Sequence, residues 1–199
     1  FYFNWLDSRL VRDDPLHKDI DGYLWSVHSG GFYRIEKLKG PPKQLPKVLH
    51  WFKWEAYTTW ISGFALMVIV YYLNANSMLL NNKGIINNPY QAIFISLLFI
   101  FFSWFVYDFL CKNFRSEDQS LFVITGFLIT FFFSYILAQI YGSRAAYIHV
   151  GAIIGTIMAA NVFKVIIPAQ KNLVLAAENN SKVDLNLSLA AKNRSIHNN

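Results

Sequence analysis

The sequence predicts an all-α integral membrane protein, a helical bundle with four full transmembrane helices plus the end of a truncated upstream helix. Two observations lead to this fold class. Of the 199 residues, 54% are hydrophobic and only 15% are charged, against about 25% charged in soluble proteins. The apolar residues are also gathered in four long blocks, which indicates lipid as the surrounding solvent.

The chain divides into four parts in sequence order. Residues 1–12 begin with aromatic residues followed by charges, which is typical of the end of a spanning helix at a membrane interface. Residues 13–54 are rich in aromatics and glycines, so we expect an ordered cytoplasmic interfacial loop with one or two short helices. Residues 55–167 are predicted to form the four-helix membrane bundle. Residues 168–199 are predicted to be a cytoplasmic polar tail that leads to a further element.

Each apolar block is close to the about 20 residues that a helix needs to cross a bilayer core. The predicted spans are residues 55–73, 91–111, 121–142 and 145–167. Short loops separate them, so consecutive helices are expected to be antiparallel neighbours in an up-down bundle.

The basic residues indicate how this bundle is oriented. Nine precede the first span, two lie between the second and third spans, and five lie at the end of the fourth span or after it, all on one side. Lys83 and Arg144 are alone on the other side. The positive-inside rule makes the basic side cytoplasmic. The net charge of +6 therefore reflects the membrane topology. No nucleic-acid-binding motif accompanies it. The expected binding partner of the helices is membrane lipid.

Cys111 is the only cysteine in the sequence. A single cysteine excludes an internal disulfide, a CxxC zinc pair and a cysteine-ligated iron–sulfur cluster. Any bound metal or haem would need histidine ligands.

His149 lies about four residues inside the fourth predicted span, where a polar ring is costly unless it has a partner. Two interpretations are open. His149 either binds a haem or metal, or handles protons, or it is hydrogen-bonded across helices to a hydroxyl such as that of Thr125, Ser134 or Tyr141.

The same span carries small residues at Gly151, Gly155 and Ala159. This spacing lets another helix, or a flat cofactor, approach closely, and both interpretations are open. Asn161 lies deeper in the span, and a buried amide there must be hydrogen-bonded.

The stretch LHWFKWEAYTTW at residues 49–60 places ionisable side chains among aromatic ones. One interpretation is an interfacial belt, in which the aromatics anchor the helix and Lys53 extends to the headgroups. The other is a site at the membrane mouth, in which His50 and Glu55 handle protons while Lys53 holds an anionic substrate.

The remaining histidines lie outside the predicted spans. His28 is followed by Ser29 and two glycines, which allow a turn with positive φ and close approach to a ligand. His17 is expected at the surface in a charged loop, and His197 lies in the terminal motif RSIHNN.

Four stretches of the sequence are distinctive in combination. They are GYLWSVHSGGFYRIEK at residues 22–37, LHWFKWEAYTTWISG at residues 49–63, HVGAIIGTIMAANVFKVIIPAQK at residues 149–171 and RSIHNN at residues 194–199. Together they resemble one family, the amino-terminal membrane domain of the bacterial membrane-bound urate oxidase (urate hydroxylase). In that family the membrane domain is usually followed by a carboxy-terminal cytochrome c domain, for which these 199 residues carry no motif.

The resemblance implies a multi-pass protein of the bacterial inner (plasma) membrane that oxidises urate to 5-hydroxyisourate. Electrons would pass to the respiratory chain through haem or cytochrome c, with cytochrome c as the external acceptor and an anionic purine as substrate. An alternative function is a haem-b-binding electron-transfer or accessory subunit without urate chemistry. A noncatalytic membrane module or carrier is also open.

Residues in the matching stretches are the candidates for these roles. The catalytic candidates are His28, His50, Lys53 and Glu55. His149 is the candidate metal or haem b ligand, and the other cofactor-binding candidates are Gly151, Gly155, Asn161 and His197.

Overall fold

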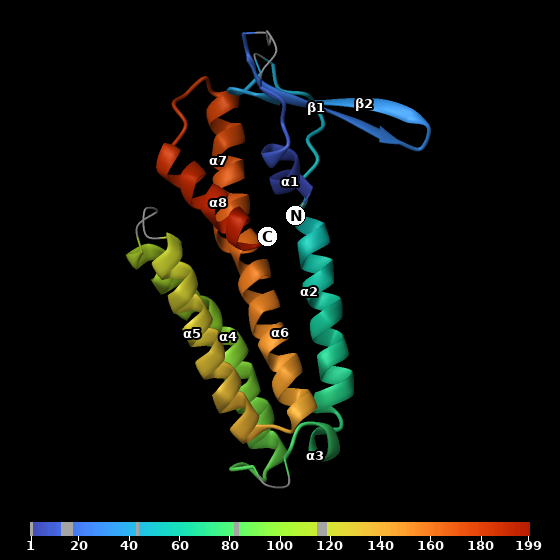
Figure 1. Cartoon of the computed structure of the whole chain (residues 1–199), viewed down its shortest axis with the longest axis vertical. Helices are drawn as coiled ribbons and strands as arrows, with labels where there is room; N and C mark the ends of the chain where they lie inside the picture. The colour runs from blue at the N-terminus through green and yellow to red at the C-terminus, as the bar shows by residue number, and fades with distance from the viewer. Residues whose placement is uncertain (1, 13–17, 43, 82–83, 115–118) are drawn as a thin grey trace. The chain divides into compact units, whose positions relative to one another are not determined.

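The structure, a computed structural model, describes residues 2–12, 18–42, 44–81, 84–114 and 119–199 (Figure 1). His17, Lys43, Lys83 and Arg115 lie outside these ranges. The described chain is mostly helical, as predicted. The elements in order are α1 (Tyr2–Ser8), β1 (Ile20–His28), β2 (Gly31–Leu38), α2 (Lys53–Met67), the π-helix η1 (Val68–Tyr72), α3 (Ala75–Met78), α4 (Pro89–Asn113), α5 (Gln119–Ile140), α6 (Ser143–Asn161), the π-helix η2 (Val162–Ile166), α7 (Ile167–Glu178) and α8 (Leu185–His197).

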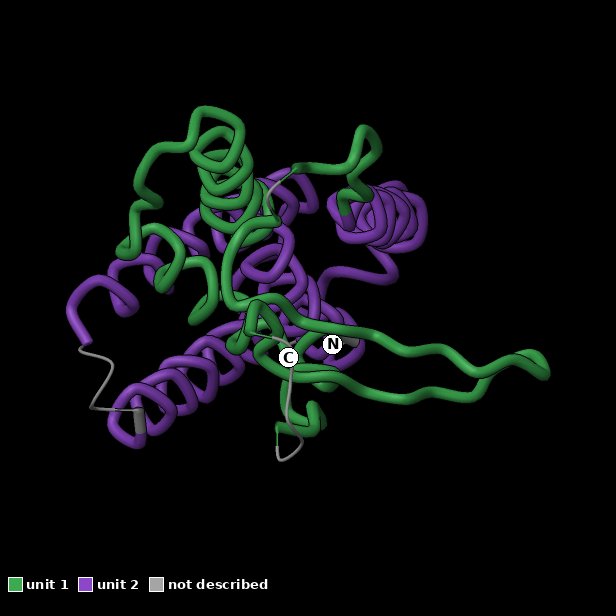
Figure 2. The backbone as a smooth tube through the Cα atoms, turned by 90° about the horizontal axis from the view of Figure 1, so that it is seen from above, with its two compact units in different colours: residues 1–51, 161–199 green, residues 52–160 purple. Residues whose placement is uncertain are grey.

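The chain falls into two compact units, drawn in green and purple in Figure 2. Unit 1 comprises Phe1–Trp51 and Asn161–Asn199, and unit 2 comprises Phe52–Ala160. Unit 1 therefore joins the start of the chain to its end, whereas unit 2 is one continuous segment.

Three helices of the described chain are long and apolar enough to cross a membrane. They are α4, the stretch Ser120–Ile140 of α5, and the 36-residue run Ser143–Glu178. The prediction of apolar helices for the second, third and fourth spans is confirmed. The last run continues past residue 167 because η2 and α7 prolong α6 without a break.

The first predicted span corresponds to α2 and η1. α2 alone has 15 residues, fewer than the about 20 needed to cross the bilayer core. Only together with the five residues of η1 does this helix reach that length.

α4 illustrates how the sequence sets the start of a span. The side chain of Asn88 accepts hydrogen bonds from the backbone N–H groups of Tyr90 and Gln91, and Pro89 is the first helical residue. An Asn cap followed by Pro is a preferred helix start. The Asn side chain accepts hydrogen bonds from N–H groups of the first turn that have no partner within the helix, and Pro at the first helical position has no N–H group that needs one.

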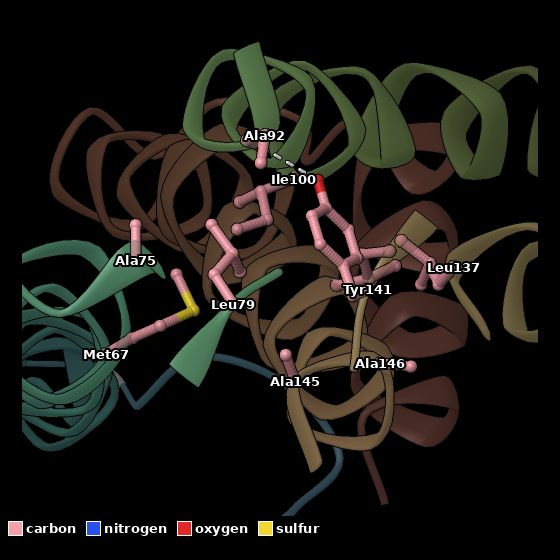
Figure 3. Close-up of a cluster of buried hydrophobic side chains, with 10 residues drawn as sticks. Met67, Ala75, Leu79, Ala92, Ile100, Leu137, Tyr141, Ala145 and Ala146 are labelled. Atoms are coloured by element: carbon pink, nitrogen blue, oxygen red, sulfur yellow. Dashed lines mark hydrogen bonds between the residues drawn. The ribbon is translucent and has the colours of Figure 1, made fainter. Parts of the chain in front are cut away.

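The core of unit 2 consists mainly of small and aliphatic side chains, with Tyr141 among them (Figure 3). Alanines at these positions let helix backbones approach closely. The buried members are Met67, Ala75, Leu79, Ala92, Ile100, Leu137, Tyr141, Ala145, Ala146 and Ile153.

α5 differs from this core because only 6% of its most apolar stretch is buried. Phe127 and Phe131 are 73% and 68% exposed. Large apolar side chains that are unburied along a span-length helix are expected where that helix faces lipid.

Residues 20–38 form an antiparallel hairpin, so the expectation of short helices is wrong for this part of the interfacial segment. His28 pairs with Gly31, which leaves Ser29 and Gly30 as a two-residue turn. Both have positive φ, 48° and 77°, as in the hairpin turns that match the twist of the strands.

The carboxy-terminal polar stretch contains a regular helix, α8. Asp184 caps it, accepting hydrogen bonds from the N–H groups of Asn186 and Leu187. An Asp side chain at this position satisfies free donors of the first turn.

Candidate functional site

His149 is fully buried in α6, and both of its ring nitrogens are hydrogen-bonded. Its Nε2 lies 2.6 Å from the Oγ of Ser96 in α4, and its Nδ1 lies 2.6 Å from the carbonyl oxygen of Ala145. Of the two interpretations left open by the sequence, this contact agrees with hydrogen bonding to a hydroxyl of another helix. The partner is Ser96, not one of the three hydroxyls named from the sequence.

Tyr141 contacts His149 through its ring instead. The two rings are stacked, with centroids 4.6 Å apart and an interplanar angle of 18°. The hydroxyl of Tyr141 donates to the carbonyl oxygen of Ala92 at 2.9 Å, the dashed line in Figure 3. Tyr141 therefore ties α4 to the turn before α6 and holds the imidazole plane in place.

The hydroxyl of Ser96 has a second partner, because the Oη of Tyr72 lies 2.5 Å from its Oγ. Tyr72 is half-buried and is the last residue of η1. We refer to Tyr72, Ser96, Tyr141, Ala145 and His149 as the His149 network. It lies wholly within unit 2, and its outer member ends a π-helix, a distortion that is frequent at functional sites.

The arrangement around His149 does not fit an axial haem ligand. An iron ligand needs one ring nitrogen with a free lone pair and room for the metal, whereas both nitrogens here have partners and one ring face is covered by Tyr141. Among the residues that the structure describes, no three His, Cys, Asp or Glu side chains gather as metal ligands.

Gly151 and Gly155 do not mark a close helix contact. A Cβ placed on either glycine would meet no atom of the described residues within 4 Å. The contact of α6 with α2 is made farther along by side chains, where the Nε1 of Trp60 donates to the Oγ1 of Thr156 at 3.0 Å. Cofactor binding at the two glycines stays a prediction.

Asn161 is fully buried and hydrogen-bonded within unit 1, as predicted for an amide at this position. Its Nδ2 donates to the Oδ1 of Asn198 at 3.0 Å, and its Oδ1 accepts from the Nη1 of Arg194 at 3.3 Å. The pKa of His197 nearby in α8 is lowered by burial and by the positive charge of Arg194. The fold thus brings Asn161 to the terminal motif, which the sequence separates by more than thirty residues.

The other candidates lie at the surface of their units. His28 is exposed beside the hairpin turn, and His50 is exposed in the segment before α2, both in unit 1. Lys53 is the first residue of α2, with its Nζ 5.5 Å from the ring centre of Trp54. Glu55 is exposed in the first turn of α2.

Within unit 2, the Lys53 end of α2 and the His149 network lie far apart. Lys53 begins α2 and Tyr72 ends η1, which at 1.5 Å per helical residue separates them by about 28 Å. The mouth site and the buried histidine predicted from the sequence are therefore two distinct places.

Tyr72 and Ser96 were not singled out from the sequence. Ser96 carried a usable signal, because it is a hydroxyl inside a long apolar block, and such groups find partners on neighbouring helices. Tyr72 carried none, since a tyrosine near the end of a span is also a normal interfacial anchor.

Comparison with known proteins gives one match. The chain matches, over residues 1–199, the protein family described as urate oxidase N-terminal. No curated protein matches it, and no solved structure does.

Proposed function

The chain belongs to the urate oxidase N-terminal family, and we propose that it is the membrane domain of an oxidoreductase that converts urate to 5-hydroxyisourate. The family match across residues 1–199 carries this proposal. The three span-length apolar helices agree with a domain that works in a membrane.

The chemistry defines what the domain must do. Urate and water give 5-hydroxyisourate, two electrons and two protons, so the reaction needs an electron acceptor and a proton acceptor. We propose that the electrons leave one at a time to cytochrome c or another respiratory-chain component. Side chains of this domain then have to bind the anionic purine and take up the protons.

Lys53 and Trp54 are the proposed contacts for the anionic purine. A cation beside an exposed aromatic face suits a flat, negatively charged ring, and Trp54 is 62% exposed. His50 and Glu55 are proton-handling candidates in the adjoining segment, and His28 is a candidate in the hairpin. These roles rest on the residue types and on their place in the stretches that resemble the family.

A haem-b electron-transfer subunit is the alternative function. It requires a histidine nitrogen for iron, and the two nitrogens of His149 are both hydrogen-bonded. The His149 described here is therefore not placed to supply that nitrogen.

We place the domain in the bacterial inner membrane with four spans, α2 with η1 serving as the first. The distribution of basic residues supports a cytoplasmic location for the basic loops and tail. Single cysteines introduced at Lys171 and Arg144, in a Cys111→Ser background, should react with a membrane-impermeant reagent from opposite faces. Labelling of both from one face would overturn this topology.

The function is tested with the full-length protein purified in detergent or nanodiscs. Urate should reduce oxidised cytochrome c, with two cytochromes reduced for each 5-hydroxyisourate formed, whereas xanthine, which lacks the 8-oxo group, should not. Absence of urate-dependent reduction in well-folded protein would contradict the proposal.

A further inference from the structure

We propose that α8 lies in the cytoplasmic leaflet of the membrane and presents an apolar stripe to the acyl chains of the phospholipids there. The stripe consists of Leu185, Leu189 and Ile196, which are all exposed. The inference goes beyond the urate chemistry and rests on the run Ser143–Glu178 crossing a bilayer. It means that the chain leaves the membrane with α7 and returns to it with α8, instead of ending in a cytoplasmic tail.

The carboxy-terminal end of α8 is tied to Asn161 within unit 1. The side-chain amide of Asn161 donates to the Oδ1 of Asn198 and accepts from the Nη1 of Arg194. α8 also packs against α7 and η2, so it runs back along the helix that precedes it in the chain (Figure 1). The depth of Asn161 in the bilayer therefore sets the depth of this end of α8.

Asn161 lies near the middle of the run Ser143–Glu178. At 1.5 Å per residue, Asn161 is about 27 Å from the start of the run and about 26 Å from its end. The hydrocarbon core of a bilayer is about 30 Å thick. Wherever that core is placed along the run, Asn161 is inside it by at least about 3 Å. Tilting the helix lengthens the part within the core and does not move Asn161 out of it.

The side chains of α8 are arranged in the reverse of the pattern on a helix that faces water. Arg194 is only 6% exposed, whereas the three residues of the stripe are each at least half exposed. The stripe residues are four and seven positions apart and share one face, and Arg194, nine positions after Leu185, lies on the opposite face. In water, arginine is almost never buried and leucine usually is. A helix that buries its cation against a polar partner and exposes its apolar face is expected in lipid.

α1 meets α8 at the same end and has the composition of an interfacial segment. The Nδ2 of Asn4 donates to the carbonyl oxygen of Ser195 at 2.8 Å. Phe3 and Trp5, the neighbours of Asn4 in the chain, are exposed aromatic residues. Aromatic rings, Trp above all, are enriched where a protein passes through the headgroup region. The surroundings of Ser195 therefore agree with a position at the edge of the hydrocarbon core.

The test measures the depth of a nitroxide spin label in the full-length protein, reconstituted into liposomes of phosphatidylethanolamine and phosphatidylglycerol. The label is attached to Lys182→Cys, Leu189→Cys or Ile196→Cys in a Cys111→Ser background. Molecular oxygen concentrates in the hydrocarbon core and a nickel chelate stays in water, so the ratio of their collision rates with the label reports its depth. This ratio should rise from Lys182, in the loop before α8, through Leu189 to Ile196.

Phe131→Cys provides the reference for lipid contact. Phe131 is exposed within the apolar length of α5, so its label should collide often with oxygen and rarely with nickel. All of the replaced side chains are exposed, and the variants should therefore fold as the parent protein does.

The three possible results for the Ile196 label lead to different conclusions. Oxygen collisions that dominate, as for the Phe131 label, support the proposal. Nickel collisions that dominate, as for the Lys182 label, would overturn it, because α8 would then lie in water. Low collision rates with both reagents would also overturn it, since another protein segment or a second copy of the chain would then cover the stripe.

Discussion

The Oγ of Ser96 in α4 lies 2.6 Å from the Nε2 of His149 in α6, so one short hydrogen bond joins two long apolar helices. Both side chains are completely buried. In such surroundings neither polar group can exchange its partner for water, and losing one leaves the other unsatisfied.

Ser96→Ala should therefore destabilise the protein more than the same change at Ser103. Losing the Ser96 hydroxyl leaves Nε2 of His149 without its donor, at a cost of about 1–3 kcal/mol. Ser103→Ala removes a hydroxyl that donates to its own helix and should cost well under half of that. Thermal unfolding in one detergent measures both, and equal melting temperatures for the two variants would contradict the role of the cross-helix bond.

Thr156→Val should loosen the contact between α2 and α6. Valine keeps the shape of threonine but removes the oxygen that accepts from the Nε1 of Trp60, at a cost of about 1 kcal/mol. Thr130→Val is the control, because the Thr130 hydroxyl donates to the carbonyl of Gly126 in its own helix. The prediction is wrong if the two substitutions shift the unfolding temperature equally.

The attachment of α8 should weaken at acid pH because of His197. Burial and the charge of Arg194 lower its pKa below 6.5, so the folded state binds a proton less readily than the unfolded state does. Stability is complete above pH 6.5 and falls as the pH decreases through that value. Hydrogen exchange of the α8 amides should quicken over this range, and His197→Gln should remove the effect.

His28→Gln is the control for this experiment. His28 is exposed on the hairpin, so its replacement should leave the pH dependence of α8 exchange as it is in the wild type. A pH dependence that survives in His197→Gln would assign the effect to another group.

His149→Gln should leave the visible spectrum of the purified protein as it is. Both ring nitrogens of His149 have protein partners, so no iron-bound imidazole is lost with the ring. A Soret band that is present in the wild type and lost only in His149→Gln would show that His149 binds haem. The hydrogen bond between His149 and Ser96 would then have to be broken in the haem-bound protein.

The sequence predicted the parts of the fold that depend on the surrounding lipid, which are the long apolar helices. The apolar blocks at residues 91–111 and 145–167 lie within observed span-length helices, and the block at residues 121–142 does so up to Ile140, because about 20 apolar residues satisfy their backbone polar groups in a bilayer only as a helix. Placing an unpaired polar side chain inside a membrane costs free energy, and this cost led us to expect hydrogen-bond partners for the buried side chains of His149 and Asn161.

The hairpin was missed although its signal was present. Tyr23, Trp25 and Val27 alternate along one strand, and a Ser-Gly pair separates it from the next, which is the pattern of a hairpin with a two-residue turn. Aromatic residues near a membrane are equally typical of interfacial helices, and that interpretation outweighed the alternation.

The partners inside the candidate site could not be predicted. Which hydroxyl meets His149 depends on the rotation of α4 about its axis, and α4 is apolar on all sides, so no periodic pattern defines its inner face. Tertiary packing alone selects Ser96 over Thr125 or Ser134.

The exposure of α5 has a consequence for handling the protein. Only 6% of its most apolar stretch is buried, so in a bilayer its large exposed apolar side chains would contact acyl chains. Harsh delipidation should therefore disturb the exposed length of α5, which joins the buried core near its end at Leu137, before it disturbs α4 and α6, and annular lipid is in effect a structural component of this region.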